Sequence, residues 1–502
     1  MTVTKNSGHE TYEVTRGAFV NLIGNLGKFS FLGFDLVATR MLGQEIYGYY
    51  STTWMILNLA FIVCYFGAHR LVIDFVAKSK ARGDSEFYRA IVGCVLLSLV
   101  LSSLLVAAVY VFAFDIAQIF NKPPLAQYLK IVCLSAPFYC VTTIMLTATR
   151  GLKIMRVWVF VRQGLEPLLD FVIILSIVLI LGVSTAPFLA RALAFGLGCI
   201  ASIWFFSKYF SLRPLFGALP DINQWRHIFV FGFPVMLADF LFTVMLRLDI
   251  IPLSLLVPAA QVAVFQVVLN IGNVMRNIPM AIDPIMMPIV VEMRHRGDLN
   301  ALNDIYSALI RIAFLLCFGF FMLVALSGDL ILSMYGSDFV TGNLVLVLVI
   351  GGLALHTVFS SIEPVLVMSG YPYLNLMNSV FFVTINLIID FLLIPAHGLT
   401  GAAIGCFSAS VLTSIVQILQ FHFLLKIHPL SWSMLKPLVF GVGLLVLAKI
   451  SELLFLESTF YRILVSLVMI LCYFLMGWRF FFRTSERQLL GGLMKIKSSH
   501  RA

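Results

Sequence analysis

The stretch NLIGNLGKFSFLGFDLVATR, residues 21–40, is mostly apolar, yet Lys28 lies in its middle and Asp35 follows seven residues later. A run of about 20 apolar residues is long enough to cross the hydrocarbon core of a bilayer. An ionised side chain at the centre of such a helix costs at least about 2.5–3.5 kcal/mol on insertion scales. The stretch therefore predicts a membrane-spanning helix whose charged side chains are retained for a function.

The rest of the chain has the same character as this stretch. It has 502 residues, of which 61% are hydrophobic and 12% charged, whereas a soluble globular domain is about a quarter charged. We therefore predict an all-α polytopic membrane protein. Apolar runs between charged or Pro/Gly breaks predict 14 transmembrane helices, near residues 18–39, 48–73, 89–114, 125–148, 165–184, 186–208, 226–248, 257–281, 305–327, 339–363, 371–394, 397–425, 434–456 and 460–482.

Lysine and arginine are distributed unequally between the two sides of these predicted spans. Twenty-five of the 34 basic residues fall on the side that includes both termini, seven fall on the other side, and Lys28 and Arg276 lie inside spans. Because cytoplasmic segments carry the excess of positive charge, we predict a multi-pass protein of the cell (inner) membrane with both termini cytoplasmic. The net charge of +10 follows from this bias, so a nucleic-acid partner is not indicated.

Twelve of the spans look like two sets of six. The first span ends FDLVATRMLGQEIYGYY and the seventh ends ADFLFTVMLRLDIIPLSLLVPAAQVAVFQ, each with an acid, then an arginine, then a short loop and an aromatic residue. Such repeats predict two pseudo-symmetric six-helix bundles around a central site. The predicted domains are a cytoplasmic N-terminus (1–17), an N-terminal six-helix bundle (18–208), a cytoplasmic linker (209–225), a C-terminal six-helix bundle (226–425), two additional transmembrane helices (434–482) and a basic cytoplasmic tail (483–502).

Three segments resemble the polysaccharide-transporter branch of the multidrug/oligosaccharidyl-lipid/polysaccharide (MOP) superfamily. ATRMLGQEIYGYYS (38–51) resembles its R-x-L-G-x-x-x-Y-G opening. RLDIIPLSLLVPAAQVAVFQVV (247–268) is similar to its R-x-D segment, with Phe265 where tyrosine is usual, and MSGYPYLNLMNSVFFVTINLIIDFLLIPAHGLTGAAIG (368–405) contains its L-I-P-x-x-G-x-x-G-A-A pattern. The resemblance implies that the two six-helix bundles are MATE/MOP-like. It also implies a Wzx-type flippase, which moves polyprenyl-pyrophosphate-linked oligosaccharides from the cytoplasmic to the outer leaflet by alternating access for cell-surface polysaccharide biosynthesis.

A polar stripe in the first span supplies the first site candidates. Asn21, Lys28 and Asp35 are each seven residues apart, so they share one helical face. Lys28 and Asp35 are separated by about 10 Å along the axis, too far for a direct pair. The stripe either faces a hydrated cavity or makes static salt bridges to other helices.

A pyrophosphate that crosses a low-dielectric layer needs fixed cations. The candidates for substrate binding are therefore Lys28, Arg276, Arg70 and Asn21. Arg70 could instead pair with Asp74, four residues later, and Arg276 could simply reach toward the membrane surface. The candidates for coupling or gating are Asp35, Asp239, Arg40, Arg247 and Asp249. Transport could be driven by the membrane potential alone or by H⁺ or Na⁺.

No catalytic motif accompanies these charges. The chain lacks H-E-x-x-H, G-x-x-x-x-G-K-[ST] and G-x-S-x-G, and its eight cysteines lie in apolar runs without a C-x-x-C pair. We therefore expect a transporter with no cofactor, no metal and no catalytic residue. The expected partners are the polyprenyl-pyrophosphate-linked glycan, anionic membrane lipids at the C-terminal tail, and other polysaccharide-assembly membrane proteins.

Three alternatives stay open at this point. The first is a MATE-like cation-coupled drug antiporter, which would need an acidic central site and about 12 spans. The second is a polytopic glycosyltransferase or polymerase, which would need a sizeable external loop. The third is a non-transporting component of a polysaccharide synthesis and export complex. The basic tail RFFFRTSERQLLGGLMKIKSSHRA either lies on the inner leaflet or is a solvated tail.

Overall fold

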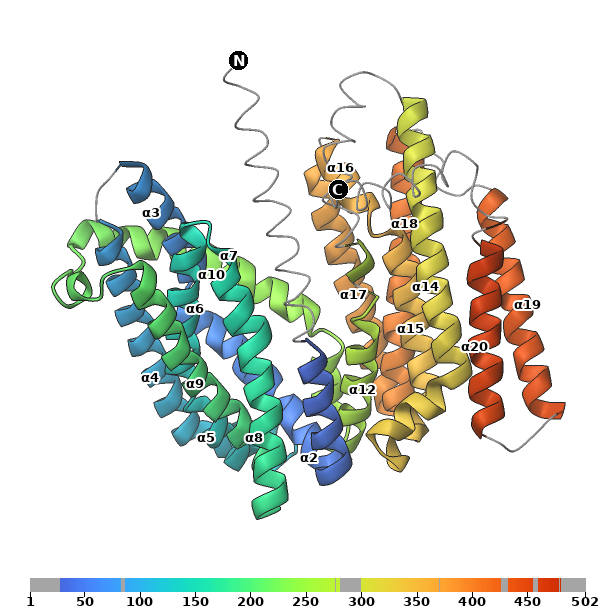
Figure 1. The fold of residues 1–502 in the computed structure, drawn as a ribbon, viewed down its shortest axis with the longest axis horizontal. Coiled ribbons are helices and arrows are strands. Elements are labelled where there is room, and N and C mark those ends of the chain that lie inside the picture. The colour runs from blue at the N-terminus through green and yellow to red at the C-terminus, as the bar shows by residue number, and fades with distance from the viewer. Residues whose placement is uncertain are drawn as a thin grey trace, which may run out of the picture. The chain divides into compact units, whose positions relative to one another are not determined.

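The computed structural model describes residues 28–82, 86–275, 277–279, 299–369, 371–425, 432–454, 459–477 and 479. Within these ranges the protein is all-helical (Figure 1). It divides into two compact units, Met1–Ala263 and Val264–Ala502, which are described one at a time. The domain limits predicted from the sequence, with a linker at 209–225, stay a prediction.

The N-terminal unit is a bundle of long apolar helices joined by short connections. It contains α2 (Lys28–Tyr65), α3 (Ala68–Arg82), α4 (Phe87–Ile119), α5 (Leu125–Cys133), α6 (Ala136–Gly151), α7 (Met155–Trp158), the π-helix η1 (Val159–Leu165), α8 (Glu166–Leu181), α9 (Ala186–Tyr209), the short 3₁₀ helix η2 (Arg213–Phe216), α10 (Ile222–Leu246) and α11 (Ile250–Leu256). Helix α12 (Ala259–Gly272) begins in this unit and continues into the second.

Helix α2 is not straight but folds back on itself at Gly43. Gly43 has φ 85° and ψ 172°, a conformation that residues with a side chain rarely adopt. In a straight helix residues 35 and 47 would be about 18 Å apart, yet the Tyr47 hydroxyl donates a 2.8 Å hydrogen bond to Asp35. The rings of Phe34 and Tyr50 also approach to 5.2 Å between centroids. The two arms, 28–42 and 44–65, therefore run side by side and match the first two predicted spans.

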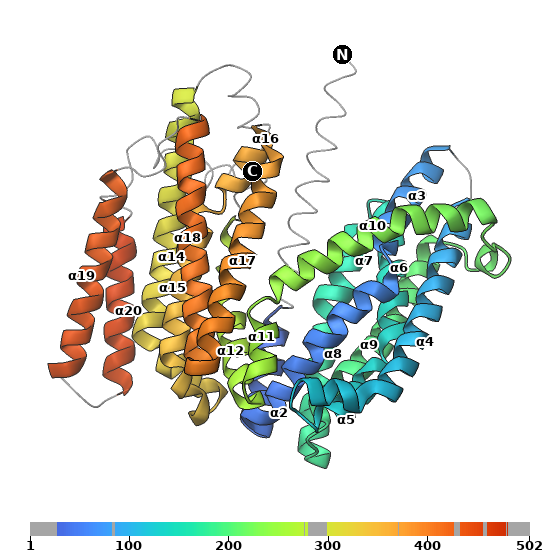
Figure 2. The same ribbon diagram turned by 180° about the vertical axis from the view of Figure 1, so that it is seen from behind.

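Helix α10 packs on α2, α3 and α4 (Figure 2). The closest approach is at the corner between α2 and α3, where Gly67 has a left-handed φ of 68°. A Cβ atom on Gly67 would lie 2.7 Å from the backbone oxygen of Gly232 in α10. The two glycines therefore let the backbones touch, as small residues do at helix interfaces in membranes.

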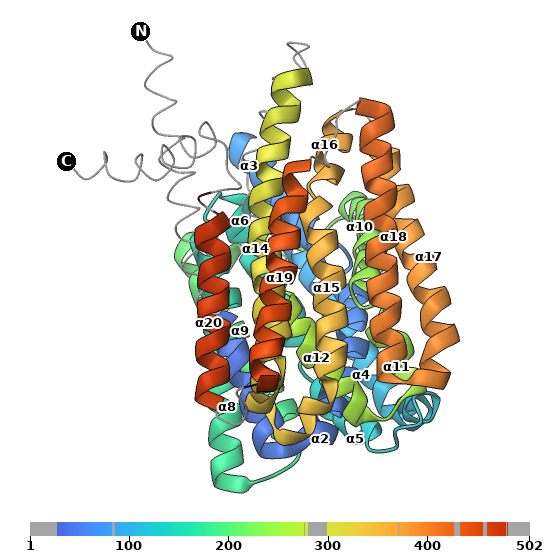
Figure 3. The same cartoon turned by 90° about the vertical axis from the view of Figure 1, so that its right-hand side faces the viewer.

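The C-terminal unit is a second bundle. It contains α14 (Leu299–Tyr335), the 3₁₀ helix η3 (Ser337–Gly342), α15 (Asn343–Phe359), α16 (Ile362–Met368), α17 (Pro372–His397), α18 (Leu399–Leu425), α19 (Trp432–Leu454) and α20 (Thr459–Met476). In this bundle α15 packs between α14 and α18, α17 packs on α18, and the α19–α20 pair packs on α14 (Figure 3).

The prediction of an all-helical polytopic membrane protein is confirmed. Within the described ranges nine helices are long and apolar enough to span a membrane, or ten when the bent pair Leu125–Cys133 and Ala136–Gly151 is counted as one span. The first of the nine, Leu32–Ser79, includes the fold-back at Gly43. Helices α19 and α20 lie where the last two spans were expected. The count of 14 stays a prediction.

Candidate functional site

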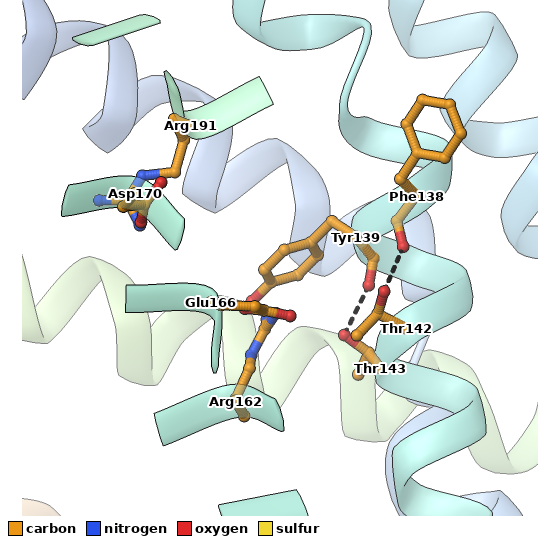
Figure 4. A network of polar contacts seen from close by, with 8 residues as sticks. All are labelled: Phe138, Tyr139, Thr142, Thr143, Arg162, Glu166, Asp170 and Arg191. Carbon is orange, nitrogen blue, oxygen red and sulfur yellow. Dashed lines mark hydrogen bonds and ion pairs between the residues drawn. The ribbon is translucent and has the colours of Figure 1, made fainter. Parts of the chain in front are cut away.

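A cluster of charged side chains lies inside the N-terminal unit, where a membrane protein would otherwise be apolar. We call it the buried charge network: Asp35 on α2, Arg162 on η1, Glu166 and Asp170 on α8, and Arg191 on α9. Figure 4 shows its members on η1, α8 and α9. The three carboxylates and Arg191 are each 7% exposed or less. Charged residues at this depth are expensive and usually mark functional sites.

Arg191 is the centre of one half of the network. Its Nη1 atom lies 2.5 Å from Asp170, which is fully buried. Its Nε atom donates a 2.9 Å hydrogen bond to the hydroxyl of Tyr50. The guanidinium also lies 4.9 Å from the ring of Trp54. A planar cation that is paired, hydrogen-bonded and stacked on aromatic rings recovers much of the cost of burial.

Arg162 and Glu166 form the other half. The Nη1 atom of Arg162 donates to both carboxylate oxygens of Glu166, at 3.1 and 2.8 Å. The Arg162 guanidinium lies 4.0 Å from the centroid of the Tyr139 ring. Figure 4 shows Arg162, Glu166 and Tyr139 near one another. Arg162 lies in the π-helix η1 (Val159–Leu165), and such segments are rare and occur often at functional sites.

Asp35 adds a third carboxylate beside these two ion pairs. It is 7% exposed and accepts the hydrogen bond from Tyr47. Among the described side chains the buried charge network therefore holds three carboxyl groups and two guanidinium groups.

A second charged group joins α3 to α10. The Arg70 Nη2 atom lies 2.9 Å from one carboxylate oxygen of Asp239, and His69 Nε2 lies 3.4 Å from the other. The Arg70 side chain is 57% exposed and that of Asp239 14%. The expected pairing of Arg70 with Asp74 is wrong. Asp74 instead pairs with Lys78 one turn further along α3, at 2.6 Å, because α10 brings Asp239 to Arg70.

Of the remaining predicted site residues, some lie outside the described residues and the others are located by the helix that carries them. Asn21 and Arg276 lie outside the described residues, and Lys28 is the first residue of α2, with its side chain outside them. Arg40 is exposed on the first arm of α2. Arg247 and Asp249 lie between α10 and α11 and both are engaged in interactions. Their roles in binding, coupling or gating stay predictions.

Three residues of the buried charge network were not predicted from the sequence as site residues: Arg162, Glu166 and Arg191. The spacing of Arg162 and Glu166, four residues apart inside an apolar run, was a usable signal for a local ion pair. No local signal links Arg191 to Asp170, since they lie on different helices. The spacing of Arg70 and Asp239 in the sequence likewise did not indicate that these two residues pair.

Within the described part of the chain, no group of three His, Cys, Asp or Glu residues is placed to hold a metal ion. The cysteines are free thiols, and seven of the eight are buried.

Several solved structures of membrane transporters resemble this chain. The chain is similar to the lipid II flippase MurJ in an inward closed conformation, with 15% identity, a TM-score of 0.69, and coverage of 92% of this chain and 100% of that one. It is also similar to an inward-facing MATE family multidrug resistance transporter, with 15% identity, a TM-score of 0.66, and coverage of 82% and 98%. A MOP superfamily transporter from Pyrococcus furiosus aligns with 15% identity, a TM-score of 0.55, and coverage of 82% and 95%. The protein thus shares the fold of these transporters.

The family follows from the sequence match. Residues 14–294 match the family model for polysaccharide biosynthesis proteins. The chain therefore belongs to the polysaccharide biosynthesis protein family, and the expected resemblance to the MOP superfamily is confirmed. No curated protein sequence matches the chain.

Proposed function

We propose that the protein translocates a polyprenyl-pyrophosphate-linked oligosaccharide from the cytoplasmic to the outer leaflet of the cell membrane, with both termini in the cytoplasm. The observation that carries the proposal is that the chain belongs to the polysaccharide biosynthesis protein family and aligns with the lipid II flippase structure over 92% of its length. A flippase of this kind handles a lipid whose tail stays in the bilayer while its charged head crosses. The exported glycan then supplies cell-surface polysaccharide assembly.

The length of the structural match supports a flippase over a drug antiporter. The lipid II flippase aligns with 92% of this chain and the MATE transporter with 82%. The difference is about the length of the α19–α20 pair, which spans Trp432–Leu454 and Thr459–Met476. The longer match to the flippase therefore favours a lipid substrate over a drug.

Charge supports an anionic substrate head. Arg70 is more than half exposed and has its charge balanced by a single carboxylate, Asp239, which His69 shares. A phosphate group can replace a carboxylate on a guanidinium, because both accept parallel hydrogen bonds from its fork. The Arg70 guanidinium can therefore offset the free-energy cost of moving a pyrophosphate out of water. Lys28 and Arg276 are the further candidates.

The buried charge network supports coupling to a cation. Its three carboxyl groups are buried inside the N-terminal unit, and a buried carboxyl group is the kind of side chain that takes up and releases a proton or a monovalent cation during a transport cycle. Asp35 is the candidate carrier, because it is the carboxyl group of the network that was selected from the sequence for coupling, and it is buried, at 7% exposed. Outward movement of an anion would in addition be favoured by about 2.3 kcal/mol per charge per 100 mV of inside-negative potential.

The test is to delete the gene in its native host and extract the membrane lipids for mass spectrometry. We expect one polyprenyl-pyrophosphate oligosaccharide to accumulate, and its mass would identify the cargo. The gene for the Arg226→Ala protein, which changes an exposed arginine at the start of α10, should reverse the accumulation. Unchanged lipids together with new sensitivity to cationic dyes would overturn the proposal in favour of a drug antiporter.

A further inference from the structure

The loop between α4 and α5 presents Lys122 on a rigid backbone. Asn121 adopts a left-handed φ of 51°, and its N–H donates to Gln118 O while the N–H of Lys122 donates to Ala117 O, both at 2.9 Å. These two bonds form the Schellman motif that ends a helix. Pro123 and Pro124 follow at once, so both sides of Lys122 are conformationally restricted.

The side chain of Lys122 reaches the end of α11. Its Nζ atom donates to Ser254 O and, at 3.0 Å, to Val257 O. In a continuing helix the carbonyl of Ser254 would accept the N–H four residues later, but that residue is Pro258, which has no N–H. Lys122 therefore takes the place of the missing donor, 132 residues away in the sequence. It is only 4% exposed.

A backbone contact lies beside this cap. Gly48, on the second arm of α2, packs so closely on Ala259 that a Cβ atom at position 48 would overlap the Ala259 backbone oxygen. Ala259 is the first residue of α12, two residues after Val257. We call the set Lys122, Ser254, Val257, Gly48 and Ala259 the loop clasp. It ties the α11–α12 connection to α2 and to the α4–α5 loop within one unit.

The loop clasp lies just before the point where the chain passes from one unit to the other. Helix α12 carries the chain across Ala263 into the C-terminal unit, so the clasp restrains the covalent passage between the two units. Alternating access requires such halves to move relative to one another. A contact made of one flexible side chain and one backbone approach can separate without unfolding a helix.

We propose that the loop clasp holds the α11–α12 connection closed in the state described here and opens during the transport cycle. This inference rests on the proposed alternating-access function. On the predicted orientation the loop clasp lies at the outer side of the membrane, so its opening accompanies release of the cargo head to the outside. Lys122 is the residue that closes it.

The chemistry of Lys122 is compatible with repeated opening. Burial lowers the pKa of Lys122 to about 8. A neutral amine still has two N–H donors, which suffice for the two carbonyl oxygens, so the closed state survives loss of the proton. When the loop clasp opens, the amine meets water, and the two carbonyls do so as well.

The test uses a cysteine at position 257 as a reporter of the closed state. Val257 is 8% exposed, and a Val257→Cys change keeps the backbone carbonyl that Lys122 contacts. The rate of maleimide labelling of purified protein in lipid nanodiscs is compared between variants, with the parent lacking this cysteine as the blank. We expect Lys122→Met to raise the rate at least fivefold and Lys122→Arg to raise it less. Lys130→Met, in the neighbouring helix α5, should leave the rate unchanged.

A second variant keeps the inference testable if Lys122→Met does not fold. Gly48→Ala must displace Ala259, so it should raise labelling at position 257 while Lys122 is intact. Unchanged labelling in every folded variant would overturn the loop clasp. Labelling needs no substrate, so this result is separate from the lipid analysis that tests the proposed function.

Discussion

Asp170 and Arg191 show how a single buried pair stabilises the N-terminal unit. Asp170 is fully buried and its partner Arg191 nearly so. Taking two charges out of water is costly, and their attraction offsets that cost only while both are present. The two residues therefore stabilise the fold only together, and either one without its partner destabilises it.

We predict that Arg191→Met lowers stability strongly, by about 3–5 kcal/mol, because it leaves a buried carboxylate without its partner. The change should appear as a lower melting temperature of the purified protein in detergent. Adding Asp170→Asn to Arg191→Met should recover part of the loss, since the uncompensated charge is then gone. Arg213→Met, at an exposed position in η2, is the control. Equal melting temperatures for Arg191→Met and the control would contradict the prediction.

The element that organises the N-terminal unit is the fold-back of α2. The two arms place Asp35 beside Tyr47 and Phe34 beside Tyr50, and Tyr50 in turn holds Arg191. The turn at Gly43 has no side chain or backbone atom within 4 Å of an added Cβ atom. The requirement for glycine there is therefore one of backbone conformation and not of space.

We predict that Gly43→Ala destabilises the protein by about 1–3 kcal/mol, the cost of a residue with a side chain in this conformation. Gly196→Ala in α9 is a matched control, because its Cβ atom would also meet nothing within 4 Å while its φ is ordinary. That change should be neutral or slightly stabilising, as alanine is favoured over glycine in a helix. Thermal unfolding of the two variants side by side measures the difference, and a similar loss in both would refute the backbone explanation.

At the scale of the whole molecule, the contact of α10 with α3 joins a candidate substrate cation to a candidate coupling acid. Arg70 and Asp239 are 2.9 Å apart, although they were selected from the sequence for separate roles. If a phosphate group replaces Asp239 on Arg70, substrate binding releases α10 from α3. The pair can thus link binding to movement of a helix.

We predict that Arg70→Ala reduces export of the lipid-linked oligosaccharide at least tenfold, and that Arg70→Lys retains part of it as a point charge. Asp239→Asn should weaken the ion pair between α10 and α3 while leaving the Arg70 guanidinium unchanged. The measurement is the ratio of lipid-linked oligosaccharide to exported glycan in cells that carry each variant at matched protein levels. Export by Arg70→Ala at the level of Arg226→Ala would exclude Arg70 from substrate binding.

The membrane fold could be predicted from the sequence because hydrocarbon imposes a local rule. Every backbone polar group in the bilayer must be satisfied, so each apolar run of sufficient length becomes a helix. The ends of α4 and α9 at Ile119 and Tyr209, for example, fall within a few residues of their predicted limits. Asp35, Asp239 and Arg70 were likewise recognisable as intramembrane or flanking charges from position alone.

The partners of these charges were decided only by the tertiary structure. Arg70 pairs with Asp239 and not with Asp74, and Arg191 pairs with Asp170. Lys122 donates to the Ser254 carbonyl, which Pro258 leaves without a donor. The physical reason is that a charge in a low dielectric pairs with whatever the bundle brings within a few ångströms. Helix packing, with close approaches such as Gly67 on Gly232, sets those distances. The sequence by itself determined the class of protein and which residues carry charge, and the packing of the helices decided which of those charges meet.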